Sequence, residues 1–231
     1  MLKGDAVITP TKADIQPQRV VLFDFDGVLI HGDSFYLFIR ERYRRSLWRR
    51  LLALLCVPLL LLLLPFSRRW PIHLLVRIAL LGLGERRYQS AAHAFAAVLT
   101  RRPKQFCRDG LQALRRHQAQ GDRVIVVTGC EHELVSGILE QLGLVDLEIL
   151  ASQLRPGWFG MRPHWHNVGR HKVQSLAKHG LTQWQQAYGD SMYDAAMLKI
   201  ADEAVLVNGT PTLCKKMEKV LGRAVTRVEW F

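Results

Sequence analysis

The chain has 231 residues, a net charge of +12 and an apolar fraction of 49%. This length accommodates one large domain, or a core domain with a smaller cap, and provides enough apolar residues for a sizeable core. The basic charge favours an acidic partner: nucleic acid, an anionic membrane surface or a phosphorylated substrate. The four cysteines form no C-x-x-C pair, which argues against a disulfide framework or a zinc site and favours reduced thiols in the cytosol. Residues 1–18 are polar, which predicts a flexible tail without a signal peptide.

The first strong pattern is an apolar run that ends in two carboxylates, VVLFDFDG at residues 20–27. Its β-branched residues predict a buried strand, with Asp24 and Asp26 at the strand end. Gly27 permits the turn that directs both carboxylates into one cleft. In an open α/β sheet, that cleft lies at the carboxyl ends of the strands. A single Asp at a strand end usually forms a cap or a turn, but the pair indicates a functional site.

A basic helix is expected at residues 35–50, followed by the uncharged segment LLALLCVPLLLLLLPF at residues 51–66. As a straight helix this segment would span roughly 25 Å, less than the hydrocarbon core of a bilayer at about 30 Å, and Pro58 would kink it. A buried core helix is the alternative, but leucine on every face argues against that interpretation. We therefore expect residues 51–66 to contact a membrane.

The weaker apolar segment at residues 71–84 is interrupted by His73 and Arg77. A single crossing by residues 51–66 would place the two halves of the active site on opposite sides of the bilayer. Arginines flank the outer ends of both segments, which suits a cytoplasmic location for both ends. A re-entrant or interfacial helical hairpin therefore fits best.

Two later strand ends carry polar side chains. The strand RVIVVT at residues 123–128 ends in Thr128-Gly129, where a hydroxyl and a backbone N–H can bind a phosphate oxygen. A further strand end is expected after Gln186-Ala187-Tyr188, at Gly189-Asp190, with Asp194 four residues further on. Lys172 lies between these patterns at the start of a short helix; considered alone, it would be a surface lysine.

The other expected elements occupy the rest of the chain. They are helices within residues 86–120 with a break near 101–103, helices at 131–144 and 211–221, strands at 147–154, 205–208 and 225–230, and a hairpin or flap at 157–160. His164 and His166 suggest a metal pair, but two loop histidines are more often incidental.

Four motifs in this order resemble the haloacid dehalogenase superfamily over residues 19–210: Asp24-Phe25-Asp26-Gly27-Val28-Leu29, Thr128-Gly129, Lys172, and Gly189-Asp190-Ser191 with Asp194. The resemblance implies an α/β fold with a Rossmann-like core, a parallel sheet and a helical cap inserted after the first strand. The core would comprise residues 19–34 and 103–231, and the cap residues 35–102. The position of the insertion resembles the phosphoserine-phosphatase-like branch. The Leu-rich segment followed by Arg68-Arg69-Trp70-Pro71 is similar to phosphatidylglycerophosphatase C, a bacterial membrane-associated family.

The resemblance also implies a role for each motif residue. Asp24 would be the nucleophile that forms an aspartyl-phosphate, and Asp26 the general acid and base. Mg²⁺ would be held by Asp24, the backbone carbonyl of Asp26 and Asp190, with Asp194 supporting the metal site. The phosphoryl oxygens would be bound by Thr128, Gly129 and Lys172.

The function expected from this resemblance is Mg²⁺-dependent hydrolysis of phosphatidylglycerophosphate to phosphatidylglycerol. The partners would be the phospholipid substrate and an anionic membrane surface, at the bacterial inner membrane with the catalytic core facing the cytoplasm. The first alternative is a phosphatase of a soluble ester such as phosphoserine. The second is a membrane-bound adaptor on the same fold. Nucleic-acid binding is not expected, because the basic residues cluster around the apolar insertion and no binding module is recognisable. The sequence leaves the oligomeric state open.

Overall fold

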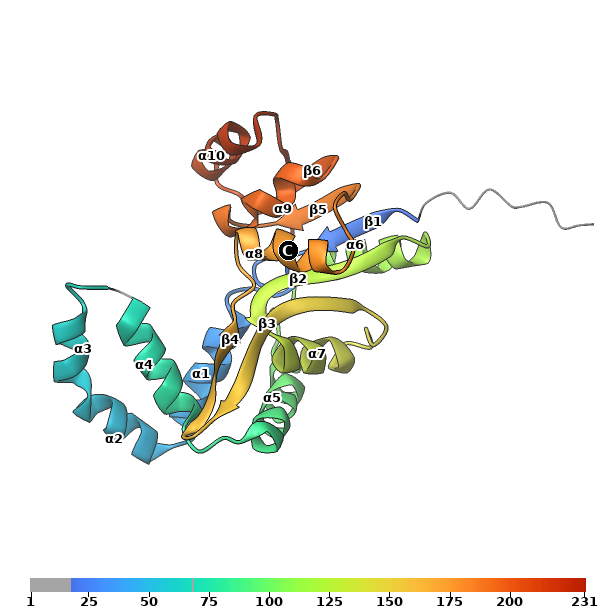
Figure 1. The fold of residues 1–231 in the computed structure, drawn as a ribbon. Coiled ribbons are helices and arrows are strands. Elements are labelled where there is room, and N and C mark those ends of the chain that lie inside the picture. Colours follow the sequence, from blue (N-terminus) through green and yellow to red (C-terminus); the bar gives the residue numbers. More distant parts are fainter. Residues whose placement is uncertain (1–17, 68) are drawn as a thin grey trace, which may run out of the picture.

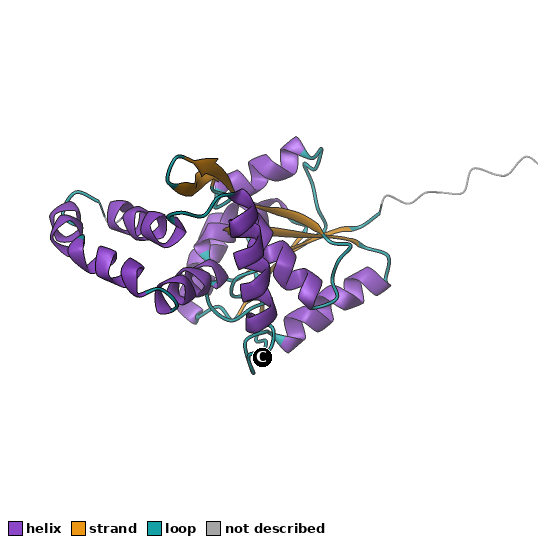
Figure 2. Cartoon of the chain, turned by 90° about the horizontal axis from the view of Figure 1, so that it is seen from below, coloured by secondary structure: helices purple, strands orange, loops and turns teal. Residues whose placement is uncertain are grey.

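The computed structural model describes residues 18–67 and 69–231, which build a seven-stranded sheet with helices on both sides (Figures 1 and 2). The strand order is β4-β3-β2-β1-β5-β6-β7, and every neighbouring pair is parallel except the antiparallel pair β3–β4. The strands are β1 (Val20–Phe23), β2 (Arg123–Glu131), β3 (Glu148–Gly157), β4 (Gly160–Trp165), β5 (Gln186–Gly189), β6 (Glu203–Val207) and β7 (Thr226–Val228). This is the mostly parallel α/β architecture that the motifs predict.

Helices α1 to α6 lie between β1 and β2, and the others connect the later strands. They are α1 (Ser34–Arg44), α2 (Leu47–Leu55), α3 (Val57–Leu63), α4 (Arg69–Leu80), α5 (Glu85–Leu99), α6 (Arg108–Ala119), α7 (His132–Gln141), α8 (Arg170–Lys178), the 3₁₀ turn η1 (Met192–Asp194), α9 (Ala195–Ile200) and α10 (Pro211–Leu221). Helices α2, α3 and α4 project from one end of the sheet (Figure 1). We call the segment from α2 to α4 the arm.

Side chains alternate across the sheet and build a core on each face. Phe23 of β1 packs with residues of α5, α6 and α7, including Leu114 and Val135. Leu22, its neighbour on β1, packs on the opposite face with residues of α8, α9 and α10, including Leu176. Because β1 is buried on both faces, its sequence is apolar throughout rather than alternating.

The insertion differs from the sequence prediction in where its helices end. The single helix expected at residues 35–50 is wrong, because α1 ends at Arg44 and α2 begins after Ser46. Residues 51–66 also do not form one helix: α2 ends before Cys56, and Pro58 lies in the first turn of α3, where a missing N–H costs nothing. In the described part of the chain, no helix is both long enough and apolar enough to cross a bilayer.

Other expected boundaries also shift. The strand predicted at residues 123–128 continues to Glu131 with an irregular register after Val127. The helix expected from residue 103 begins only at Arg108, with Cys107 as its N-cap. The expected turn at residues 157–160 does connect an antiparallel hairpin, β3–β4. Apart from Gln18, the predicted N-terminal tail lies outside the described residues.

The arm presents many large apolar side chains to solvent. Those at least 45% exposed are Leu47, Trp48, Leu51, Leu54, Leu55, Leu59, Leu61, Leu62, Leu64, Phe66, Trp70 and Ile72. Monomeric soluble proteins rarely expose contiguous apolar surface on this scale, and such surfaces commonly mark contact with a membrane or with another protein.

Candidate active site

The central strand of the sheet, β1, and its neighbour β5 are each followed by an aspartate. Asp24 directly follows β1 and Asp190 directly follows β5, and these strands are neighbours. The strand order reverses here, because β2 lies on one side of β1 and β5 lies on the other. Such a switch point opens a crevice at the carboxyl ends of the strands. The fold therefore brings together carboxylates that are 166 residues apart in the sequence.

The turn after β1 allows Asp190 to approach closely. Gly27 has φ +80°, a conformation that residues with a side chain rarely adopt. A Cβ at this position would lie 2.0 Å from Asp190 Oδ2. The positive φ and the close approach of Asp190 both require glycine at position 27, which explains the glycine of the D-x-D-G pattern in steric terms.

Replacing Gly27 with Ala is expected to displace the Asp190 carboxylate and to raise the Mg²⁺ concentration for half-maximal activity at least about tenfold. Titration of activity with Mg²⁺ measures this effect. Gly32→Ala is the matched control, since Gly32 has φ +81° and a Cβ at this position would have no heavy atom within 4 Å. Equal effects of the two substitutions would show that backbone strain, not contact with Asp190, is responsible.

Lys172 is the buried cation of the site. Its side chain is 2% exposed, and its Nζ lies 2.8 Å from Asp24 Oδ1 and 2.6 Å from Asp194 Oδ1. The contact with Asp194 is a hydrogen bond, whereas the contact with Asp24 is an ion pair without hydrogen-bond alignment. Helix α8 begins at Arg170 and thus directs Lys172 into the crevice. Lys172 is therefore not the surface lysine that its position in the sequence alone would suggest.

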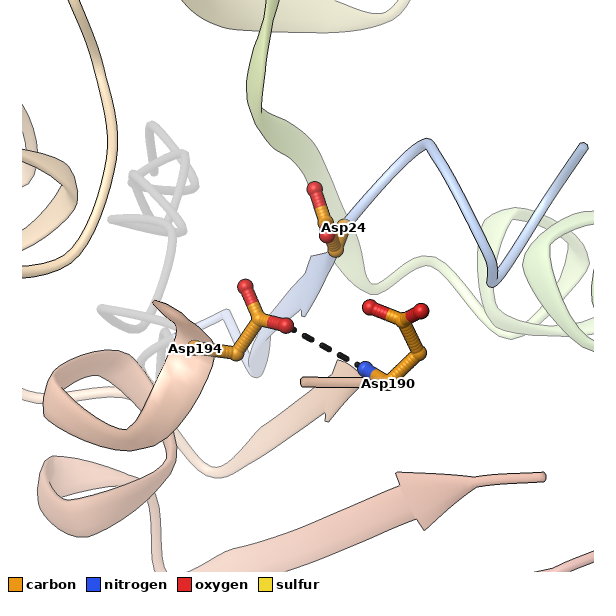
Figure 3. Close-up of side chains that lie close together, drawn as sticks. All are labelled: Asp24, Asp190 and Asp194. Atoms are coloured by element: carbon orange, nitrogen blue, oxygen red, sulfur yellow. Dashed lines mark hydrogen bonds between the residues drawn. The ribbon is translucent and has the colours of Figure 1, made fainter. Parts of the chain in front are cut away.

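Asp194 has both oxygens engaged. Oδ2 accepts a hydrogen bond from the Asp190 backbone N–H at 3.2 Å (Figure 3). Oδ2 also accepts from the Ser191 N–H and hydroxyl at 3.1 and 3.0 Å, and Oδ1 binds Lys172. Asp194 is fully buried, and a Cβ on Gly189 would lie 2.5 Å from the Cβ of Asp194. It therefore fixes Lys172 and the turn that carries Asp190, which agrees with a supporting role at a metal site.

Three carboxylates gather in the crevice. Oxygens of Asp24, Asp190 and Asp194 lie within 4.8 Å of one another (Figure 3). Burial, followed by repulsion from Asp194, raises the pKa of Asp24 well above its usual value, although Lys172 opposes the shift. The same two causes raise the pKa of Asp190 to about 6. Oxygen-rich, charge-dense sites of this kind suit Mg²⁺, which would relieve the repulsion. The residues therefore fit the predicted ion.

The Asp26 carboxylate lies outside this cluster. Its Oδ1 accepts a hydrogen bond of 2.9 Å from the backbone N–H of Ser34, the first residue of α1. Burial raises its pKa to about 6, while the hydrogen bonds from Ser34 act in the opposite direction. A carboxyl with this pKa can both donate and accept a proton near neutral pH. Metal contact through the backbone carbonyl of Asp26 stays a prediction.

The irregular last part of β2 holds the predicted phosphate-binding pair, Thr128 and Gly129. Thr128 is fully buried, and its Oγ1 accepts a hydrogen bond of 3.0 Å from Cys130 N–H, so its hydroxyl proton remains to be donated. The Gly129 carbonyl accepts a hydrogen bond of 2.7 Å from Ser152 Oγ. A Cβ on Gly129 would lie 2.7 Å from Val168, so the loop before α8 packs directly against this part of β2.

Sequence reasoning missed the residues that hold this part of β2. The buried Asn167 donates from its backbone N–H to Ser152 Oγ at 2.9 Å and from Nδ2 to the Leu150 carbonyl at 2.8 Å, while its Oδ1 accepts from Ser175 Oγ at 2.9 Å. Through Ser152, whose hydroxyl also binds the Gly129 carbonyl, these bonds connect β2 and β3 with the loop before α8 and with α8 itself. No local motif marks them, because each joins residues at least eight positions apart.

Substituting Asn167 with Ala is expected to lower the free energy of unfolding by about 2–4 kcal/mol, because the buried Leu150 carbonyl and Ser175 hydroxyl lose their partner. Urea denaturation measures the loss. Ser175→Ala removes only one of these bonds and is expected to cost about 1 kcal/mol. Equal stability of Asn167→Ala and the unmodified protein would contradict the positioning role of Asn167.

Comparison with known families agrees with this geometry. The family model described as haloacid dehalogenase-like hydrolase matches residues 21–199, which include every predicted site residue. The chain belongs to this family. The expectation of a hydrolase of this superfamily, made from the motifs, is thereby confirmed.

Solved structures resemble this haloacid dehalogenase-like hydrolase over most of its length. A protein of unknown function from Bordetella pertussis Tohama I has a TM-score of 0.66 at 20% identity, covering 90% of this chain and 98% of its own. A HAD family hydrolase from Salmonella enterica serovar Typhi has a TM-score of 0.58 at 13% identity, with 92% and 68% covered. A substrate-bound phosphoserine phosphatase has a TM-score of 0.56 at 16% identity, with 92% and 93% covered. At these identities the likeness establishes the fold.

Proposed function

We propose that this hydrolase is a Mg²⁺-dependent phosphoric monoester hydrolase that acts through an aspartyl-phosphate on Asp24. The observation that carries the proposal is the position of Asp24: a strand-end carboxylate 2.8 Å from the buried ammonium of Lys172 and within 4.8 Å of two further carboxylates. Lys172 favours the ionised form of Asp24, which is the nucleophilic form.

The side chains support a two-step reaction. Asp24 attacks the phosphorus while the alcohol oxygen leaves and takes a proton from Asp26. Asp26, now ionised, then accepts a proton from the water that attacks the phosphorus of the acyl phosphate, which restores Asp24 and releases phosphate. Lys172 and the Thr128 hydroxyl would bind the phosphoryl oxygens. Bound Mg²⁺ would neutralise part of the phosphoryl charge and orient its oxygens.

For the substrate, we propose phosphatidylglycerophosphate, whose acyl chains would stay in the bilayer while its terminal phosphate enters the crevice. The exposed leucines of the arm and the arginines flanking them support contact with an anionic membrane surface. The cellular site would be the bacterial inner membrane, with the crevice facing the cytoplasm. The phosphoserine phosphatases among the structural neighbours make a soluble phosphomonoester the second candidate.

Turnover of the lipid should depend on the arm, whereas turnover of a soluble ester should not. Leu55 and Leu61 are 78% and 60% exposed. Replacing both with Asp is expected to lower phosphate release from phosphatidylglycerophosphate in mixed micelles at least about tenfold. The reason is that each leucine that becomes buried in the micelle contributes about 1.5–3 kcal/mol to binding. Release from a soluble aryl phosphate is expected to stay unchanged.

Val145→Asp is the control, because Val145 is 67% exposed and lies outside the arm. It should leave release from both substrates unchanged. Hydrolysis of phosphoserine but not of phosphatidylglycerophosphate would reject the lipid assignment and keep the aspartyl-phosphate mechanism.

A further inference from the structure

Buried polar atoms without a hydrogen-bond partner concentrate at one place outside the active site. Among residues 18–67 and 69–231, four buried side-chain atoms have no such partner: Asp24 Oδ1, Arg42 Nε, Ser46 Oγ and Arg49 Nε. Asp24 faces Lys172 and the carboxylate cluster. The other three atoms lie within eight consecutive residues where α1 passes into α2. Because buried polar groups in folded proteins are nearly always paired, such a cluster indicates a missing ligand.

The chain geometry at this junction leaves hydrogen-bond donors available. Ser46 is the N-cap residue of α2, with extended φ and ψ of −138° and 105°, yet its side chain makes no capping bond. It is only 8% exposed. The N–H groups of the first helical turn have no intrahelical acceptor, so they attract anions. Arg49 lies within this first turn, and Arg42 lies one turn before Ser46 on α1.

The charges at the junction are not balanced by nearby carboxylates. Glu41 is engaged by three other arginines, Arg44, Arg45 and Arg102, at 3.5, 2.7 and 3.8 Å. In the described part of the chain, Arg42 and Arg49 form no ion pair. Arg49 donates to the Leu81 carbonyl at 3.2 Å, and its guanidinium lies 4.4 Å from the centre of the Trp48 ring. Burial, followed by repulsion from Arg49 and Arg45, lowers the pKa of Arg42. Two partly buried guanidinium groups, those of Arg42 and Arg49, require a negative counter-charge.

We infer that Arg42, Ser46 and Arg49 form a binding site for a phosphate-type oxyanion, separate from the catalytic crevice. Guanidinium groups and helix N-termini are the donors that such anions use most often. Arg42 lies eight residues along α1 from Ser34, the residue bonded to Asp26, which is about 12 Å along the helix axis. The exposed Leu47 and Trp48 flank the site, so the bound group is either a phospholipid headgroup at the membrane surface or free phosphate.

The test compares two double variants of the full-length protein that remove the same charge. Arg42→Gln with Arg49→Gln alters the junction, whereas Arg44→Gln with Arg50→Gln removes two exposed arginines from the same two helices. Co-sedimentation with phosphatidylcholine vesicles, with and without phosphatidylglycerol, measures headgroup binding. The thermal shift on adding inorganic phosphate measures binding of the free anion. Neither measurement requires substrate or turnover, so the outcome is independent of the proposed function.

We expect the junction variant to lose about tenfold more affinity for phosphatidylglycerol vesicles than the control variant. Each variant removes two positive charges, so the non-specific electrostatic attraction to the vesicle surface falls equally in both. A selective loss of the phosphate-induced thermal shift, with vesicle binding equal in both variants, would identify free phosphate as the ligand. Equal behaviour of the two variants in both measurements would overturn the inference.

The variant Ser46→Ala separates a loss of ligand binding from a loss of folding. Its hydroxyl has no partner in the described structure, so its removal is expected to leave the melting temperature without ligand unchanged. If the site binds an oxyanion, this variant should bind vesicles or phosphate about three- to tenfold more weakly, as for one lost hydrogen bond to a charged group. Unchanged binding of both ligands would contradict the assignment of Ser46 to the site.

Discussion

Asp24→Asn is expected to reduce phosphate release from every phosphomonoester substrate by more than about 10³-fold, since the loss of a nucleophile removes the reaction path itself. Asn has the shape of Asp but carries no anionic oxygen for attack on phosphorus. The fold should survive, because burial already disfavours the charge on Asp24 and Lys172 keeps its 2.6 Å contact with Asp194. Phosphate release and the melting temperature are measured on the same preparation.

Asp146→Asn is the matched control, since Asp146 is exposed on a surface loop after α7. It should retain full activity. An Asp24→Asn protein that keeps more than about one tenth of the activity would contradict the nucleophilic role.

Lys172→Met is expected to lower the free energy of unfolding by about 3–5 kcal/mol, as for other buried ion pairs that lose one partner. Lys172 is fully buried between Asp24 and Asp194, and its loss leaves two buried carboxylates facing each other without a cation. Phosphate release should also fall, because the ammonium group contacts the nucleophile. Urea denaturation at about pH 5 and about pH 8 measures the stability.

The loss should be larger at the higher pH. Lys172 lowers the pKa of Asp24, so without it the pKa of Asp24 in the folded variant rises further above that in the unfolded chain. The folded variant then holds a proton that the unfolded chain has released, so its stability falls as pH rises above the ordinary Asp pKa of about 4. Lys178→Met, an exposed position on the same helix, should change stability by less than about 1 kcal/mol. A Lys172→Met protein as stable as this control would disprove the burial argument.

The candidate active site is partly predictable from the sequence because two of its carboxylates directly follow strands. Asp24 follows an apolar run, Asp190 lies in the Gly189-Asp190-Ser191 motif, and parallel strands present these ends to one crevice. The steric reason for glycine at position 27 appears only in the structure, where Asp190 occupies the space of the missing Cβ. The strand-end pattern and the order of the motifs therefore placed these carboxylates in one cleft, whereas their mutual contacts appear only in the structure.

The insertion is less predictable because its helices are ended by local geometry rather than by a change in polarity. Ser46 adopts extended dihedral angles between two helices that both combine arginines with large apolar residues, so no polar segment marks the break. Likewise, each bond of Asn167 joins residues that are at least eight positions apart in the sequence. A pattern that depends on the nearest few residues contains no signal for either feature.

The most direct test of the mechanism is detection of the phosphorylated enzyme. The full-length protein is mixed with a soluble aryl phosphate and Mg²⁺, quenched in acid during turnover, digested and analysed by mass spectrometry. We predict that the peptide containing Asp24 gains the mass of one phosphoryl group, and that the Asp24→Asn protein shows no such peptide. Turnover without a phosphorylated peptide, or with the phosphoryl group on a different residue, would contradict the aspartyl-phosphate mechanism.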